Sequence, residues 1–187
     1  MKKIIASFKE SAKELKNIRC LTLAGMLGAM SVILSNFTIV VTDSLKISFF
    51  FLPSRIAYYL FGPFVGTIFG ASIDILNFIV KPTGPFHPGF TINAALSGMI
   101  FGLLLYKKPL KFSRILITST INMIIVNLIL NTYWISTITG NAVWASLPLR
   151  ITKNIILLPF EAILLYLVIK GVESTGVIKM LSHGRNN

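Results

Sequence analysis

Long apolar runs constrain the fold of this chain more than any other feature. A helix needs about 20 apolar residues to cross roughly 30 Å of hydrocarbon. Only 13% of the 187 residues are charged and 54% are hydrophobic, whereas a soluble domain has about a quarter of its residues charged. The chain is therefore predicted to be an integral membrane protein. Five runs suit membrane-spanning helices: 20–41, 65–80, 90–106, 115–138 and 145–169.

A shorter apolar run, 49–61, is interrupted by Pro53 and Arg55. As a straight helix it is too short to cross a bilayer, so we expect it to span with help from the preceding loop. Gly62-Pro63 predicts a tight turn, and the prolines of segment 81–89 exclude regular helix there. The fold class predicted is all-α, a bundle of six transmembrane helices.

The distribution of basic residues predicts the orientation of this bundle. Six spans place both termini on one side of the membrane. That side receives 13 of the 18 Lys and Arg residues, in the segment to Arg19, the loop 107–114 and the tail. By the positive-inside rule both termini are cytoplasmic. The net charge of +12 thus reports topology, and nucleic-acid binding is not expected.

The chain divides into three parts. In residues 1–19, apolar residues recur at spacings of three and four, and lysines lie between them. This pattern is typical of a basic amphipathic helix on a membrane surface. Residues 20–171 form the six-helix transmembrane domain, and 172–187 form a cytoplasmic tail.

Polar residues inside the expected spans gather near the middle and in the outer half. Such groups are costly in hydrocarbon unless they are paired or line a cavity. Their clustering therefore predicts a polar pocket open to the outside, with Asn122 and Glu161 as exceptions. The clustered residues are Asn36, Arg55, Asp74, Asn77, Thr91, Asn93, Asn127, Asn131, Arg150, Lys153 and Asn154.

Several of these residues favour anion binding. Arg150 and Lys153 lie three apart on one helix face, and Asn154 joins that stripe. The aromatic residues Tyr133, Trp134 and Trp144 flank the same end. Simpler interpretations remain open: the tryptophans belong to an interfacial belt, the asparagines join helices, Arg55 neutralises Asp74, and Glu161 pairs with Asn122 or faces a partner.

Small residues on the first span form two overlapping small-xxx-small pairs, Ala24, Gly25, Gly28 and Ala29. Gly66 and Gly70 repeat the spacing on the third span. Such pairs let another helix approach closely. They serve either packing within the bundle or docking of another membrane subunit.

Signatures of catalysis and of metal or cofactor binding are missing from the sequence. The glycines of 171–176 have phosphate-loop spacing, but Val177 and Ile178 occupy the positions that need Lys and Ser or Thr. No HExxH or GxSxG pattern is present. The single cysteine, Cys20, excludes an internal disulfide and a cysteine-based metal cluster. The chain is expected to bind a ligand without cofactor or metal and to be no enzyme.

Residues 62–66, 70–74 and 82–98 resemble the membrane-embedded substrate-binding (S) components of energy-coupling-factor (ECF) vitamin transporters, and within them the folate-specific type. Segments 8–15 and 131–134 resemble the same family. The resemblance implies a vitamin bound near the outer surface under loops 1, 3 and 5. It also implies docking through the small residues of the first helix on a transmembrane coupling subunit with two cytoplasmic ATPases, and toppling to release the substrate inside.

A folate-like ligand fits the candidate binding residues. Its flat pterin suits stacking on Trp134, Tyr133 or Trp144 and edge hydrogen bonds from Asn77, Asn93 and Asn131, and its dianionic glutamate tail suits Arg150 and Lys153. Alternatives are an S component for pantothenate, riboflavin or biotin, a small membrane enzyme acting on a lipid phosphate, and a structural partner whose polar residues pair only with one another. Asp74 close to Arg150 and Lys153 in an empty cavity would favour the enzyme.

Overall fold

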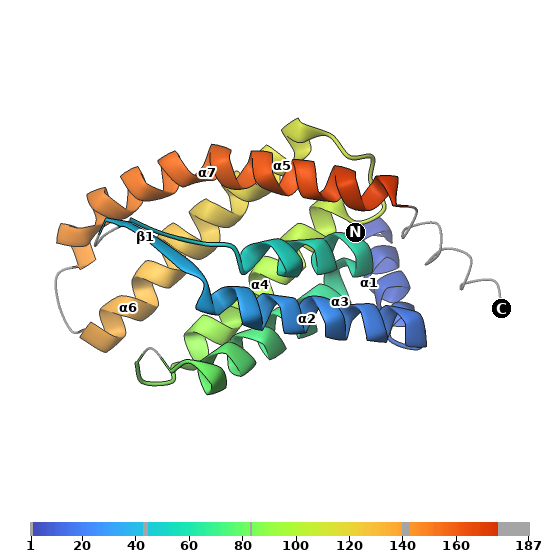
Figure 1. The fold of residues 1–187 in the computed structure, drawn as a ribbon, viewed down its shortest axis with the longest axis horizontal. Helices are drawn as coiled ribbons and strands as arrows, with labels where there is room; N and C mark the ends of the chain where they lie inside the picture. Colours follow the sequence, from blue (N-terminus) through green and yellow to red (C-terminus); the bar gives the residue numbers. More distant parts are fainter. Residues whose placement is uncertain (1, 43–44, 83, 140–142, 176–187) are drawn as a thin grey trace.

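The computed structural model describes residues 2–42, 45–82, 84–139 and 143–175. These residues form an elongated helical bundle with one short hairpin (Figure 1). The helical fold class is confirmed. In chain order the elements are α1 (Lys2–Glu14), α2 (Ile18–Asn36), β1 (Thr38–Thr42), β2 (Leu45–Ser48), α3 (Phe51–Val80), α4 (Pro88–Leu105), α5 (Phe112–Asn122), the π-helix η1 (Met123–Leu130), α6 (Asn131–Thr139) and α7 (Val143–Ser174).

Five helical stretches within the described residues are long and apolar enough to cross a membrane. Four of them lie in α2, α3, α4 and α7, and the fifth is the continuous stretch 112–138 made by α5, η1 and α6. The prediction of a membrane protein is thus confirmed. The count differs from the predicted six because two of the expected spans lie within α3.

Helix α3 reverses direction at Gly62. In a straight helix, Tyr58 and Gly70 would lie about 18 Å apart, yet a Cβ added to Gly70 would lie 3.0 Å from the Tyr58 hydroxyl. Gly62 has φ +84°, which suits glycine, and a Cβ there would collide with the ring of Tyr106. The turn predicted at Gly62-Pro63 is therefore confirmed, and the two halves of α3 lie side by side.

A side chain from α1 caps both helix ends at this turn. The Ser11 hydroxyl donates to the carbonyl of Phe61 at 2.6 Å and accepts the backbone N–H groups of Phe64 and Val65, both at 3.1 Å. Ser11 is fully buried. Backbone groups that a broken helix leaves unpaired need such partners, so α1 completes the turn of α3.

A second buried contact fixes α1 to the bundle. Tyr106 donates to the Glu14 carboxylate at 2.9 Å, and Cys20 donates to the same carboxylate at 3.2 Å. Burial raises the pKa of the Tyr106 phenol above its ordinary value, and the nearby Glu10 carboxylate adds to the rise. The phenol thus stays protonated and remains a donor. Helix α1 lies at the same end of the bundle as the carboxyl end of α7, where Tyr59 donates to Glu173 at 2.6 Å (Figure 1).

Close packing joins the second half of α3 to α4. A Cβ added to Gly66 would lie 2.8 Å from the carbonyl oxygen of Gly98, and one added to Gly70 would collide with the carbonyl of Ala94. These distances leave no room for a side chain, so the two backbones touch. Gly66 and Gly70 therefore serve packing within the bundle, which was one of their two interpretations.

An antiparallel hairpin, β1–β2, follows α2 at the end of the bundle opposite α1 (Figure 1). The span predicted for 20–41 is wrong at its end, because helix α2 stops at Asn36 and residues 38–42 are a strand. These five residues, Thr-Ile-Val-Val-Thr, are all β-branched, and β-branched side chains favour strands over helices. The hairpin leads the chain into the short first half of α3.

Replacing Ser11 with Ala leaves buried backbone groups at the α3 turn without a partner. We expect Ser11→Ala to lower the free energy of unfolding by about 1–3 kcal/mol, measured by denaturant unfolding of the purified protein in detergent. Ser7→Ala is the matched control, since Ser7 is half-buried on the same helix. An equal loss of stability in the two variants would contradict the capping role of Ser11.

Candidate functional site

A cavity of about 410 Å³ opens between α3, α4, η1 and α7, with one residue each of α5 and α6 also in its wall. This volume lies within the range of ligand-binding pockets. None of its described lining residues belongs to α1, and one of them, Phe50, lies two residues after the end of β2. The lining comprises Phe50, Phe51, Ser54, Arg55, Tyr58, Gly70, Ile73, Asp74, Asn77, Phe90, Asn93, Ala94, Ser97, Phe101, Asn122, Val126, Asn127, Asn131, Lys153, Asn154, Leu157 and Glu161.

An ion pair joins α3 to α7 at one side of this cavity. Arg55 Nη2 donates to Glu161 Oε2 at 2.7 Å. The guanidinium also lies between two aromatic rings, 4.4 Å from the centroid of Phe51 and 4.8 Å from that of Phe101, where cation–π attraction adds to the ion pair. Arg55 therefore does not neutralise Asp74, and Glu161 does not pair with Asn122. Both of those interpretations are wrong.

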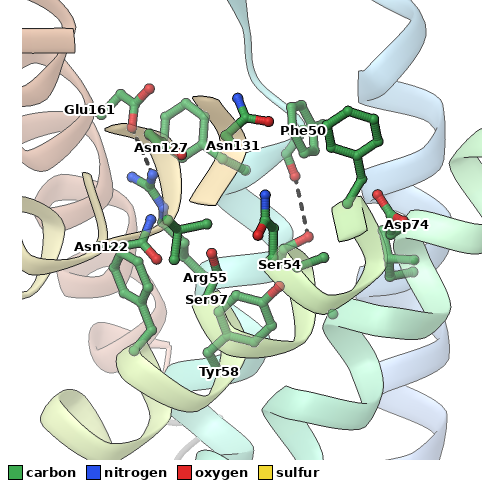
Figure 2. Close-up of a pocket in the computed structure, with 18 of the residues that line it drawn as sticks. Phe50, Ser54, Arg55, Tyr58, Asp74, Ser97, Asn122, Asn127, Asn131 and Glu161 are labelled. Atoms are coloured by element: carbon green, nitrogen blue, oxygen red, sulfur yellow. Dashed lines mark hydrogen bonds and ion pairs between the residues drawn. The ribbon is translucent and has the colours of Figure 1, made fainter. Parts of the chain in front are cut away.

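The second carboxylate lies on the other side of the cavity. Figure 2 shows Asp74 opposite Arg55, Asn122 and Glu161. Thr91 donates to Asp74 at 2.8 Å. Lys153 lines the cavity and has no ion pair among the described residues. The lining thus holds two basic and two acidic side chains, rather than the excess of cations that the sequence pattern indicates.

Asparagines supply most of the remaining polar lining. Five asparagines of the predicted polar cluster line the cavity: Asn77, Asn93, Asn127, Asn131 and Asn154. Asn122 joins them. The sequence pattern sets Asn122 apart from that cluster, and its place in the lining corrects the prediction. Glu161, the other exception, lines the cavity as well.

The π-helix η1 explains how Asn122, Asn127 and Asn131 reach the same cavity. At 100° per residue, an α-helix would place Asn131 about 180° from Asn122, on the opposite face. Hydrogen bonds from residue i to i+5 put more residues into each turn and reduce the rotation per residue. The spacing of asparagines in an otherwise apolar run is the sequence feature that could have indicated this wider turn.

Unpartnered polar atoms mark where a ligand can bond. Arg55 Nη1, Asn77 Oδ1 and Asn122 Oδ1 are buried and have no hydrogen-bond partner in the described structure. All three residues line the cavity. Since buried polar groups are normally bonded, these atoms offer one donor and two acceptors to a bound molecule.

Two of the three aromatic residues predicted for binding, Tyr133 and Trp134, do not line the cavity. Tyr133 is 57% exposed. Trp134 Nε1 donates to Asn93 Oδ1 at 3.2 Å, and the centroid of its ring lies 5.3 Å from that of His87, so a hydrogen bond joins it to a residue of the lining. The side chain of Trp144 lies outside the described residues. Phe50, Phe51, Phe90, Phe101 and Tyr58 provide the aromatic lining instead.

Arg150, the other cation of the predicted stripe, is half-buried and is not part of the lining. It precedes Lys153 by about one helical turn, and its backbone carbonyl accepts a hydrogen bond from Asn154 Nδ2 at 2.8 Å. Helix α7 runs away from the hairpin end (Figure 1), so Arg150 lies nearer that end than Lys153.

The small residues of α2 divide between two faces. Gly28 is buried, and a Cβ there would lie 3.1 Å from Ile73 Cδ1. Nothing lies within 4 Å of a Cβ added to Gly25, and Ala29 is exposed. Ala24 is half-buried against the core. Gly28 therefore serves packing within the bundle, while Gly25 and Ala29 lie on the outer face.

Removing one partner of the Arg55–Glu161 pair leaves the other charge in apolar surroundings. We expect Glu161→Leu and Arg55→Met each to lower the free energy of unfolding by about 1.5–3 kcal/mol. The double variant Arg55→Met with Glu161→Leu should recover most of that loss, because no charge remains. Denaturant unfolding of the four proteins measures the coupling. Losses that simply add in the double variant would show that the two side chains do not stabilise each other.

This chain is similar to one transporter family and to two folate transporters. The family model for the substrate-specific component of ECF transporters matches residues 19–169. The folate transporter FolT of Clostridium novyi (strain NT) is 29% identical over 168 residues, which cover 90% of this chain and 98% of that protein. FolT of Leuconostoc mesenteroides subsp. mesenteroides is 27% identical over 159 residues, covering 82% and 85%.

A solved structure is similar over most of the fold. It is a crystal structure of FolT bound with folic acid, with a TM-score of 0.73 and 32% sequence identity. The similarity covers 81% of this chain and 92% of that one.

Proposed function

The chain belongs to the family of substrate-specific components of ECF transporters, and from this premise we propose that its cavity binds folate for uptake. Members of this family are transporter subunits and not enzymes. With five helical stretches able to span a membrane, the chain is a multi-pass membrane protein of the cell membrane. The similarity to a FolT structure bound with folic acid, over a fold that encloses a cavity of suitable size, carries the proposal.

The pterin ring of folate matches the walls of the cavity. It is flat and aromatic, and the rings of Phe50 and Phe90 supply surfaces on which it can stack. Its amino-pyrimidinone edge presents neighbouring N–H donors, which a carboxylate such as Asp74 accepts well. The asparagine amides Asn77, Asn93 and Asn131 offer further edge contacts. In this arrangement Trp134 positions Asn93 through the bond to its Oδ1.

The glutamate tail of folate matches the cations of α7. Lys153 in the lining would contact one carboxylate, and Arg150, one turn nearer the hairpin end, would attract the other. Tyr133 lies in α6 and Trp144 is near the start of α7. We propose that both contact the ligand at the opening of the cavity. Asn154 bonds both Asn127 and the Arg150 carbonyl and so fixes the spacing of this stripe.

We place both termini in the cytoplasm and the cavity in the outer half of the membrane. The exposed lysines of α1 lie at the end opposite the hairpin (Figure 1), and Lys107 of the loop after α4 pairs with Glu10 on that helix. The positive-inside rule assigns this basic end to the cytoplasm. The proposed partners are a transmembrane coupling subunit and two cytoplasmic ATPases. The coupling subunit would dock on the outer face of α2, where Gly25 and Ala29 permit close approach.

Folate binding is tested by calorimetry on the purified chain, with thiamine, riboflavin, pantothenate and biotin as comparison ligands. We expect saturable one-to-one binding of folic acid, and Lys153→Gln should weaken it about tenfold, since about 1.4 kcal/mol of charge attraction is lost. Lys170→Gln, a charge change at the opposite end of α7, is the control. Binding of another vitamin in place of folate would keep the transporter role and refute the proposed substrate.

Docking is tested separately, by uptake in cells that contain the coupling subunit and ATPases. Because a Cβ at Gly25 meets open space, Gly25→Leu should leave folate binding by the purified chain unchanged and reduce uptake at least tenfold. Gly171→Leu is the matched control, as nothing lies within 4 Å of that position either. Normal uptake by the Gly25 variant would contradict docking at this face.

A further inference from the structure

A second, much smaller chamber adjoins the ion-pair side of the cavity. It holds about 10 Å³, which is about the space that one water molecule needs. Residues from α3, α5, η1 and α7 enclose it: Arg55, Ser119, Asn122, Met123, Asn127, Asn154, Leu158 and Glu161.

Three polar side chains in this wall have an atom without a partner. Arg55 Nη1, Ser119 Oγ and Asn122 Oδ1 are buried and form no hydrogen bond within the described structure. The three residues are only 9%, 5% and 5% exposed, respectively. Buried polar groups of native proteins nearly always have a partner, either protein or ordered water. Three unpaired atoms around one space therefore indicate a bound molecule.

The walls of the chamber are held in place by other contacts. Arg55 is fixed by Glu161 at 2.7 Å and by the rings of Phe51 and Phe101. Asn127 Nδ2 donates to Asn154 Oδ1 at 3.3 Å, which ties η1 to α7 beside the chamber. Because these contacts fix the side chains, rotation of Arg55 toward another partner would break its ion pair.

We propose that the chamber binds one ordered water molecule. Arg55 Nη1 is a donor, Asn122 Oδ1 is an acceptor, and the Ser119 hydroxyl can act as either. A single water accepts from Arg55, donates to Asn122 and uses one further bond with Ser119. These three bonds match the usual number for a buried water. An apolar group would leave all three atoms unsatisfied.

The proposed water bonds to side chains that also line the large cavity. Arg55, Asn122 and Glu161 line both the chamber and the large cavity, whereas Ser119 lines only the chamber. Ser119 is thus a positioning residue that acts on the ligand through the water and the groups the water orients. The water site does not depend on which molecule fills the cavity, but its effect on folate affinity rests on the proposed function.

The site itself is tested on the ligand-free protein by a crystal structure at a resolution that shows waters. We expect one density peak within hydrogen-bond distance of Arg55 Nη1, Ser119 Oγ and Asn122 Oδ1. An empty chamber, or side chains rearranged to bond one another, would overturn the proposal. This measurement gives its answer even if the chain binds no folate, so failure of the water site and failure of the proposed function are distinguishable.

The effect on binding is tested by calorimetry with folic acid. Ser119→Ala removes one of the bonds to the water and should weaken binding two- to fivefold, and Ser119→Val, which fills the chamber and expels the water, should weaken it tenfold or more. Thr118→Val is the matched control, because the neighbouring Thr118 hydroxyl is buried but donates to the Arg114 carbonyl at 2.8 Å. Wild-type affinity in both Ser119 variants, with both proteins folded, would overturn the positioning role of Ser119.

Discussion

The reversal of α3 at Gly62 is the constraint on which the binding cavity depends. Arg55 and Asp74 are 19 residues apart, and in an unbroken helix they would lie about 28 Å from each other. Both line one cavity only because the chain turns back on itself. The turn needs a glycine at φ +84° and the Ser11 hydroxyl, which bonds the backbone on both sides of it. A residue of the amphipathic α1 thus supports a site although no described residue of α1 lines it.

Internal pairing of the carboxylates leaves a cavity with balanced charge and a basic surface. Besides Asp74 with Thr91 and Glu161 with Arg55, the other described carboxylates also have internal partners: Glu10 with Lys107, Glu14 with Tyr106 and Cys20, and Glu173 with Tyr59. For the carboxylates that lie inside the bundle, this pairing avoids the cost of an isolated charge in an apolar environment. The exposed lysines of α1 stay on the surface, where the proposed orientation places them in the cytoplasm. In the proposed function the cavity therefore recognises its ligand mainly by hydrogen bonds and stacking, with Lys153 as its unpaired cation among the described residues.

The sequence predicts the membrane class, the turn at Gly62-Pro63 and five asparagines of the cavity because each rests on a local rule of hydropathy or backbone geometry. It does not predict features that depend on tertiary contacts. The β-branched run 38–42 continues an apolar helix and becomes a strand by pairing with 45–48. The partner of Arg55 lies 106 residues away, and the widened turns of η1 bring Asn127 and Asn131 to the cavity that Asn122 of α5 also lines. The rotation of an α-helix, 100° per residue, would instead place Asn122 and Asn131 on opposite faces.

Helix α2 connects the two surfaces that the proposed function requires. Its outer face carries Gly25 and Ala29, while Gly28 packs against Phe69 and Ile73 on the inner face. Ile73 itself lines the cavity. The ring of Phe69 packs edge-on against Tyr58, another lining residue, with 6.1 Å between the ring centroids. A partner helix seated on the outer face would thus lie one helix away from the ligand. Since packed interiors transmit small displacements rather than absorbing them, a shift of α2 on docking would move the cavity wall directly.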